Sequence, residues 1–289
     1  MIKVSKRALK SWQHVVLAVA AFAAIAGFNL PFPVVVIAAA LFGYFVFKGQ
    51  AVENAAAAPV SIKTLVATLA IGLVVWFAPF PFLIGPGSSP VFTDLALFFS
   101  QAAIVTFGGA YAVLSYVGDV AVTHYQWLEP REMLTGLGLA ETTPGPLILV
   151  LLFVGFLAGA RQGLVDPMLG GVIGALVTLW FTFVPSFVMI FAGAPYIERI
   201  RSMPRIAGAL QGVTAAIVGV IASLGLWFAV TLFFPKGLTP LPDMLGHADI
   251  PAMLIALAAG LALLWLRIGF GWVLGAAALA GAVVKLAAF

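Results

Sequence analysis

The chain has 289 residues, of which 63% are hydrophobic and only 8% are charged, and its mean hydropathy is +1.17. Soluble domains carry roughly 25% charged residues, so this chain has too little polar surface to coat a water-soluble particle. Cysteine is absent, which excludes disulfides, thiolate zinc sites and a cysteine nucleophile. The net charge of +4 is small and spread over loops, so lipid rather than nucleic acid is the expected partner.

Apolar runs separated by charged residues, proline or glycine predict the helices in chain order. Several runs are shorter than the roughly 20 residues that span a bilayer, so neighbouring short runs are either tight hairpins of spanning helices or re-entrant pairs. We expect about eight to ten crossings. The predicted helices are 12–28, 33–47, 62–77, 91–117, 131–140, 143–160, 167–183, 184–196, 205–234, 251–266 and 269–287.

Two interruptions rich in glycine, proline and threonine break the central runs. The first is TFGGAY at 106–111, inside the run 91–117, and the second is ETTPGP at 141–146. A broken helix in a bilayer leaves backbone groups unpaired, so it persists only where protein or a water-filled site satisfies them. A pair of such breaks indicates the binding site of a transporter.

The ETTPGP segment has the chemistry of an anion site at a helix start. Thr143 is a suitable N-cap, and Pro144 suits the first helical position because its missing N–H would be unpaired anyway. The N–H groups of Gly145 and Leu147 then point from the helix start, where the macrodipole favours an anion. The alternative is an ordinary helix start at a tight loop.

The TFGGAY segment is open to two interpretations. Its Gly-Gly pair can unwind the helix and expose amides, or it can form a close-packing face between helices. Because both breaks offer hydroxyls and free amides, we interpret them as one shared oxyanion site. The predicted substrate-binding residues are Thr106, Gly108, Gly109, Thr142, Thr143, Pro144, Gly145, Pro146 and Leu147.

Glu141 is the one acidic residue between 133 and 160. A carboxylate inside a membrane is a functional hypothesis by default, because its charge is costly there. Two roles stay open for it. It carries a coupled proton, or it fixes the loop by capping amides or pairing with Arg131 or Arg161.

Other chemistry has little support in the sequence. The three histidines are far apart and lack metal-ligand spacing, and no G-x-S-x-G or H-E-x-x-H motif is present. We therefore expect no metal, no cofactor and no enzymatic activity. Arg161 is interpreted as a boundary anchor, since a cation suits a helix C-terminus, and Tyr125 and Trp127 as interfacial anchors.

The two ends of the chain carry an internal repeat. Residues 17–43 align without gaps on residues 255–281, with identities that include Phe32 with Phe270 and Gly43 with Gly281. Most identities are Ala–Ala pairs, so two hairpins that merely share a helix-packing composition are the alternative. The first copy follows basic residues and the second follows a net acidic loop, which predicts opposite orientations in the membrane, as in inverted repeats.

The stretches 98–150 and 184–221, with F-G-G and T-P-G-P in order, resemble the chromate ion transporter family. The resemblance covers about 90–280 well and 12–47 plausibly. It implies a multi-pass protein of the bacterial inner membrane that expels chromate, with sulfate as the look-alike oxyanion. It also implies two homologous halves of opposite orientation in long-chain members.

This chain resembles the C-terminal half of a long-chain member together with the last helix pair of the N-terminal half. Residues 1–50 are then the last helix pair of an incomplete first repeat, 51–90 a connecting segment with one transmembrane helix, and 91–289 a complete transport repeat. Such a chain is a truncation, or a short form that forms a homodimer or joins a partner that supplies the missing half. Leu152 stands where a polar Gln is expected in close relatives, which leaves chromate versus sulfate open.

The sequence thus predicts an all-α, polytopic integral membrane protein, an inverted-repeat transporter with broken helices. Its expected function is secondary transport of an inorganic oxyanion, chromate efflux first and sulfate or another tetrahedral oxyanion second. The alternative from another class is a non-transporting membrane scaffold or partner subunit.

Overall fold

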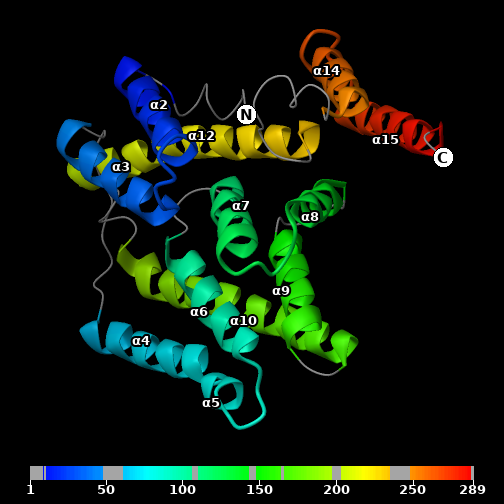
Figure 1. The fold of residues 1–289 in the computed structure, drawn as a ribbon. Coiled ribbons are helices and arrows are strands. Elements are labelled where there is room, and N and C mark those ends of the chain that lie inside the picture. Colours follow the sequence, from blue (N-terminus) through cyan, green and yellow to red (C-terminus); the bar gives the residue numbers. More distant parts are fainter. Residues whose placement is uncertain are drawn as a thin grey trace. The chain divides into compact units, whose positions relative to one another are not determined.

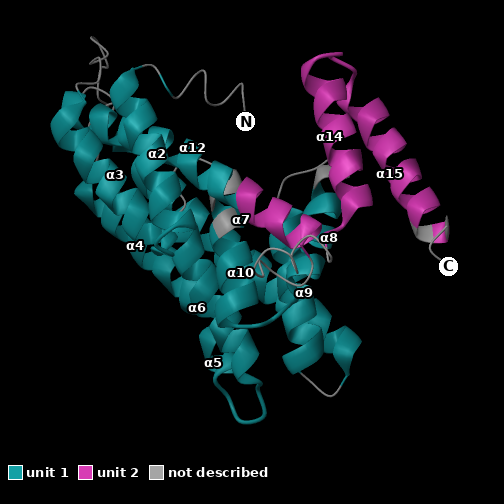
Figure 2. Ribbon diagram, turned by 45° about the horizontal axis from the view of Figure 1, so that its top comes forward, with its two compact units in different colours: residues 1–224 teal, residues 225–289 magenta. Residues whose placement is uncertain are grey.

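A computed structural model describes residues 9, 11–47, 61–105, 110–142, 148–163, 166–196, 203–234 and 248–287, and these are helical with no β-strand (Figure 1). The chain divides into two compact units, residues 1–224 and 225–289, with the boundary inside α12 (Pro204–Phe233) (Figure 2). In the described part, three segments are long and apolar enough to cross a membrane, and shorter apolar helices accompany them. The three are Ile62–Leu83, Pro167–Tyr196 and Pro204–Phe233. The predicted all-α membrane fold is confirmed.

Helices α2 (Trp12–Ala26) and α3 (Phe32–Val46) form a hairpin that packs on α12. The backbones approach closely because glycines face each other: a Cβ added to Gly43 would lie 2.9 Å from the Cα of Gly212 and against the carbonyl of Gly208. Small residues at membrane-helix interfaces permit this approach. The same contact buries a cluster made of Ala21, Val35, Ala39 and Ala216.

Helices α9 (Ile148–Gln162) and α10 (Pro167–Gly193) share a second glycine contact. A Cβ on Gly159 would collide with the carbonyl of Gly170, and a Cβ on Gly174 with the carbonyl of Gly155. Each helix thus presents two glycines four residues apart to the other, the spacing that brings two membrane helices into backbone contact. Helix α10 also packs against α4 (Ile62–Phe77) and α6 (Pro90–Val105).

The predicted boundary between helices 167–183 and 184–196 is wrong, because α10 continues through Pro185. Proline at this position removes the donor that would bond to the Phe181 carbonyl, a loss that membrane helices tolerate, and the Pro185 ring is fully buried. Two hydroxyls of the same helix bond to other carbonyls. Thr182 Oγ1 donates to the Thr178 carbonyl at 2.7 Å, and Ser186 Oγ donates to the Thr182 carbonyl at 2.8 Å. A short 3₁₀ turn, Ala194–Tyr196, ends the segment.

The predicted loop 118–130 is largely folded. A π-helical turn, Val120–His124, continues α7 (Ala110–Asp119), and Gln126 then reverses the chain with a φ of 53°. Trp127 is only 1% exposed, and its ring stacks on Tyr125 with 4.3 Å between centroids. The interpretation of Trp127 as an interfacial anchor is therefore wrong, because the turn carries it into the core beside Phe98 and Phe99. Tyr125 is half-buried, and its role as an anchor stays a prediction.

The remaining predicted helices agree with the structure to within a few residues. The prediction 62–77 coincides with α4, while the short α5 (Phe80–Leu83) lies in a stretch predicted as loop. Helices α8 (Pro130–Thr142), α14 (Ile250–Leu264) and α15 (Phe270–Ala287) match the predictions 131–140, 251–266 and 269–287.

Candidate substrate site

The predicted site residues lie at, and between, the ends of four helices. Helix α6 ends at Val105 and α7 begins at Ala110, while α8 ends at Thr142 and α9 begins at Ile148. The backbone of Glu141 and Thr142 forms the end of α8. The structure describes no side-chain positions for these two residues. The residues between the helices lie outside the described ranges: Thr106, Gly108, Gly109, Thr143, Pro144, Gly145, Pro146 and Leu147.

The helices that flank the two breaks pack together. Helix α9 contacts α6, α7 and α8. Gly136 of α8 gives room to the ring of Phe153 of α9, since an added Cβ would lie 2.5 Å from its Cδ1 atom. Gly118 of α7 likewise faces Met133 of α8, with 3.2 Å between an added Cβ and Cε. The structure therefore joins all four flanking helices in one packed group within residues 1–224.

An ion pair joins the start of α8 to the end of α9. Arg161 Nη1 donates to Glu132 Oε2 at 2.9 Å and to the Trp127 carbonyl at 3.2 Å, and Arg161 Nη2 donates to Glu132 Oε1 at 2.5 Å. Glu132 Oε2 also accepts from the Glu129 N–H at 2.8 Å. This forked contact is the strong arrangement for a guanidinium and a carboxylate. The ion pair joins the N-terminal end of α8 to the C-terminal end of α9. Along each helix, this is the end remote from residues 143–147.

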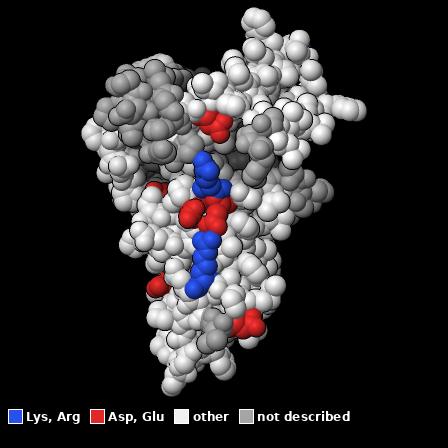
Figure 3. Space-filling view, turned by 45° about the vertical axis from the view of Figure 1, so that its right-hand side comes forward, with Lys and Arg blue, Asp and Glu red and all other residues white. Residues whose placement is uncertain are grey.

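Sequence reasoning missed Glu132 as the partner of Arg161. The signal was present, because Glu132 comes three residues after Glu129, where a Glu caps the helix start through the backbone N–H. Two consecutive helices of 13 and 15 residues, separated by only five residues of sequence, also bring these ends together. On the face in Figure 3, adjoining acidic and basic side chains form a strip, and a few separate acidic side chains lie to either side of it. Charge on this face is thus largely gathered into one strip.

We expect replacement of Glu132 by Gln to destabilise the protein at neutral pH by up to about 1 kcal/mol, the range of exposed ion pairs. Hydrogen bonds from Arg161 and from the Glu129 backbone lower the pKa of Glu132 below its ordinary value of 4.5. A lowered pKa stabilises the fold above pH 4.5, and this contribution is lost as the pH falls through the lowered pKa. Thermal unfolding in detergent at pH 7 and pH 4 should show the difference from wild type shrinking at acid pH. Glu129→Gln is the matched control, and an equal loss in both variants would contradict the assignment.

No group of three His, Asp or Glu side chains that could hold a metal is found among the residues that the structure describes. His14, one of the three histidines of the chain, packs in the protein instead. Its Nδ1 lies 2.6 Å from Ser11 Oγ, and its ring stacks on Phe47 with 4.2 Å between centroids. These contacts assign His14 a packing role in the first hairpin.

Comparison with known proteins gives the family context of these helices. The sequence profile of the chromate transporter family matches residues 93–282. The chain is 27% identical over 237 residues to a chromate transport protein of Cupriavidus metallidurans, covering 74% of this chain and 53% of that protein. It is 30% identical over 174 residues to a chromate transport protein of Pseudomonas aeruginosa, covering 60% of this chain and 39% of that protein.

A probable chromate transport protein of Synechococcus elongatus is 30% identical over 152 residues, 53% of this chain and 35% of that protein. The chain thus spans about half the length, or less, of these three relatives. No solved structure matches the chain significantly. The match of the family profile covers most of the chain and both predicted breaks, and it shows that the chain belongs to the chromate transporter family.

Proposed function

We propose that this chain is a secondary transporter of chromate and forms one half of the transport machinery. The observation that carries the proposal is the packing of α6, α7, α8 and α9 into one group whose ends flank both glycine-rich segments. Broken helices with free amides are how membrane proteins bind anions without many formal charges. The relatives named as chromate transport proteins support chromate as the anion.

In this proposal the two segments between the helices form one oxyanion site. The amides of Gly108, Gly109, Gly145 and Leu147 donate to the ion, because glycine lets a ligand approach the backbone and a helix start favours negative charge. Hydroxyls add to this donor set, and prolines shape the start of α9. The further members are Thr106, Thr142, Thr143, Pro144 and Pro146.

Glu141 lies in the last turn of α8, directly before the proposed cradle. We propose that it either carries a coupled proton or fixes the loop. A carboxylate beside an oxyanion repels it unless the carboxylate is protonated or paired. Proton coupling therefore predicts flux that responds to a pH gradient, and a loop-fixing role predicts flux that does not.

The proposed setting is the inner membrane of a bacterium, crossed several times, with chromate moved outward. Sulfate is the competing substrate because it is a tetrahedral dianion of similar shape.

We also propose an internal duplication, which two hairpins of matching backbone geometry support. Residues 1–50 are then the end of a first repeat, 51–90 connect the repeats, and 91–289 form the second repeat. The offset that aligns the sequences also superimposes both bounds of α2 on those of α14 and the start of α3 on the start of α15, while α15 continues three residues further.

The loops of the two hairpins match in detail. Asn29 has a φ of 49° and its equivalent Arg267 a φ of 51°. In the first loop the Leu30 N–H donates to the Ala24 carbonyl at 3.0 Å, and in the second the Ile268 N–H donates to the carbonyl of the equivalent Ala262 at 3.0 Å. Left-handed conformations are uncommon outside glycine, so their recurrence at aligned positions favours duplication over shared composition.

Chromate flux into sealed vesicles tests the proposed function. The purified chain, in lipid vesicles, should accumulate radiolabelled chromate, and sulfate should compete. Imposed pH gradients then separate the two roles of Glu141. Folded protein that gives no flux alone or with a homologous first half would contradict transport and favour a scaffold subunit.

A further inference from the structure

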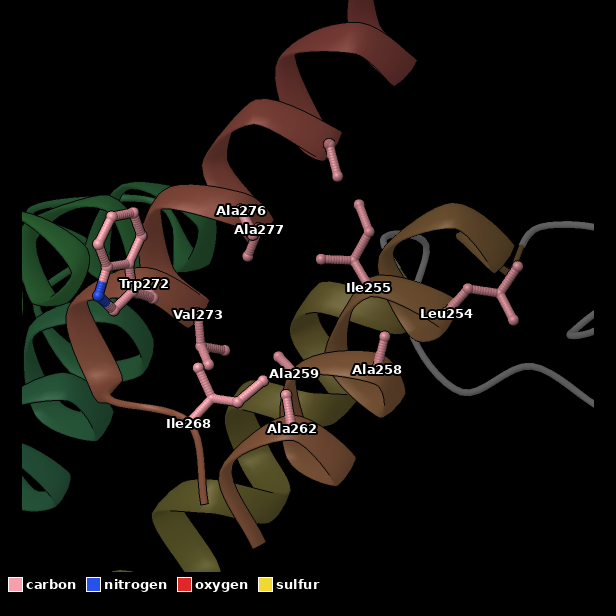
Figure 4. A pocket seen from close by; sticks show the side chains of 11 residues that line it. Leu254, Ile255, Ala258, Ala259, Ala262, Ile268, Trp272, Val273, Ala276 and Ala277 are labelled. Atoms are coloured by element: carbon pink, nitrogen blue, oxygen red, sulfur yellow. The ribbon is translucent and has the colours of Figure 1, made fainter. Parts of the chain in front are cut away.

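The hairpin of α14 and α15 carries an open apolar groove of about 640 Å³. Its lining comes from both helices and from Ile268 in the loop between them, and Ile255, Ala259, Ala262 and Val273 lie around the space between the helices (Figure 4). The indole N–H of Trp272 is the one polar side-chain group among the lining residues, and small residues leave room along both helices. Five of the lining residues have equivalents in the first hairpin that pack on another helix: Ile255, Ala259, Ala262, Val273 and Ala277.

The equivalent groove of the first hairpin is filled. By the repeat alignment, the five lining residues correspond to Leu17, Ala21, Ala24, Val35 and Ala39. In the first hairpin these residues pack around one side chain from another helix, Ala216 of α12. Ala21 and Ala39 are consequently only 3% and 2% exposed, whereas Ala259 and Ala277 are half-buried.

The glycines of the two hairpins show the same contrast. A Cβ on Gly43 would meet the backbone of α12, at 2.9 Å from the Cα of Gly212. A Cβ on the equivalent Gly281 would meet nothing within 4 Å. The same face thus occurs on both hairpins. On α2 and α3 it packs against α12, and on α14 and α15 no described helix of the second unit covers it.

We propose that the groove of α14 and α15 binds a second helix of the α12 type, which lies outside the residues that the structure describes. The structure defines the chemistry of that helix: apolar, membrane-spanning, and carrying a small residue at every fourth position, as Gly208, Gly212 and Ala216 do in α12. The relatives are long enough to hold such a helix, since this chain spans only 53%, 35% and 39% of three of them. The inference rests on the duplication proposed above and not on chromate transport.

A second copy of the chain is a poorer occupant. Its α12 already packs its small-residue face against its own α2 and α3, through Gly208, Gly212 and Ala216. It would have to release that hairpin before it could enter the groove of a neighbour. A helix whose small-residue face is vacant has no such contact to lose.

Cysteine cross-linking to a synthetic peptide tests this docking. The chain has no cysteine, so each substitution introduces its only thiol. The probe is a peptide with the sequence of residues 204–233, lysine tails for insertion, and Ala216→Cys. In lipid bilayers the Ala259→Cys and Ala277→Cys proteins should form at least about tenfold more disulfide adduct with it than Leu279→Cys, a difference of about 1.4 kcal/mol in occupancy. Leu279 is 71% exposed and lies outside the groove.

Two further controls make the result specific. Ala21→Cys places the thiol at the equivalent position that α12 already covers, so this protein should label poorly. A peptide that also carries Gly212→Leu should lose most of the adduct, because close backbone approach needs the small residue. Labelling of Ala259→Cys no greater than that of Leu279→Cys would overturn the proposal and leave the groove to lipid. Preferential cross-linking between two copies, undiminished by the peptide, would overturn it in favour of a dimer.

Discussion

Replacement of Gly145 by Val should reduce chromate flux about 10–100-fold or more while the protein still inserts and remains monodisperse. That range corresponds to the loss of one or two hydrogen bonds to a charged ligand, each about 1.5–3 kcal/mol. In the proposed site the Gly145 amide donates to the ion, and a β-branched side chain would keep the ion away from it. The measurement is initial chromate uptake by vesicles with equal amounts of incorporated protein.

Gly193→Val is the matched control for this substitution. Gly193 ends α10, and an added Cβ there meets no atom within 4 Å. The Gly193→Val protein should therefore transport chromate at the wild-type rate. Unchanged flux in Gly145→Val, or equal losses in both variants, would remove Gly145 from the site.

Much of the helical fold could be predicted because the signals are local. Apolar runs bounded by charge or proline predicted α4 at its observed bounds and the hairpin helices to within two residues. The errors arose where tertiary contacts overrule local rules. Pro185 does not end α10, since its ring is fully buried among packed neighbours and membrane helices tolerate an internal proline. Trp127 has the sequence context of an interfacial aromatic, but a left-handed Gln126 carries it into the core.

The location of the site stays a prediction, because most of its motif residues lie outside the described ranges. The structure describes the helices on either side of the two motifs, α6, α7, α8 and α9, and packs them together. The role of each motif residue stays a prediction. The partner of Arg161 was missed because ion pairing across 29 residues depends on how two helices pack, which spacing along the chain does not encode.

Replacement of Gly174 by Leu should destabilise the fold strongly, and more than loss of the Glu132 carboxylate does. A Cβ at this position would collide with the carbonyl of Gly155 and lie 3.1 Å from the Cα of Gly159. These neighbours are backbone atoms, which cannot rotate away as a side chain can, so α9 and α10 would have to separate. Overpacking of a well-packed core costs about 1–3 kcal/mol, and separation of two backbones lies at or above the upper end of that range.

Thermal unfolding in detergent, followed by size-exclusion chromatography, measures this effect. Gly275→Leu on α15 is the control, because an added Cβ there meets nothing within 4 Å. Gly174→Ala should fall between the control and Gly174→Leu, since one methyl group already strikes the backbone. Flux should fall together with stability, because α10 holds α9, and α9 begins directly after the proposed ion site. A Gly174→Leu protein that unfolds at the temperature of the control would show that the close contact of α9 and α10 is not needed for the fold.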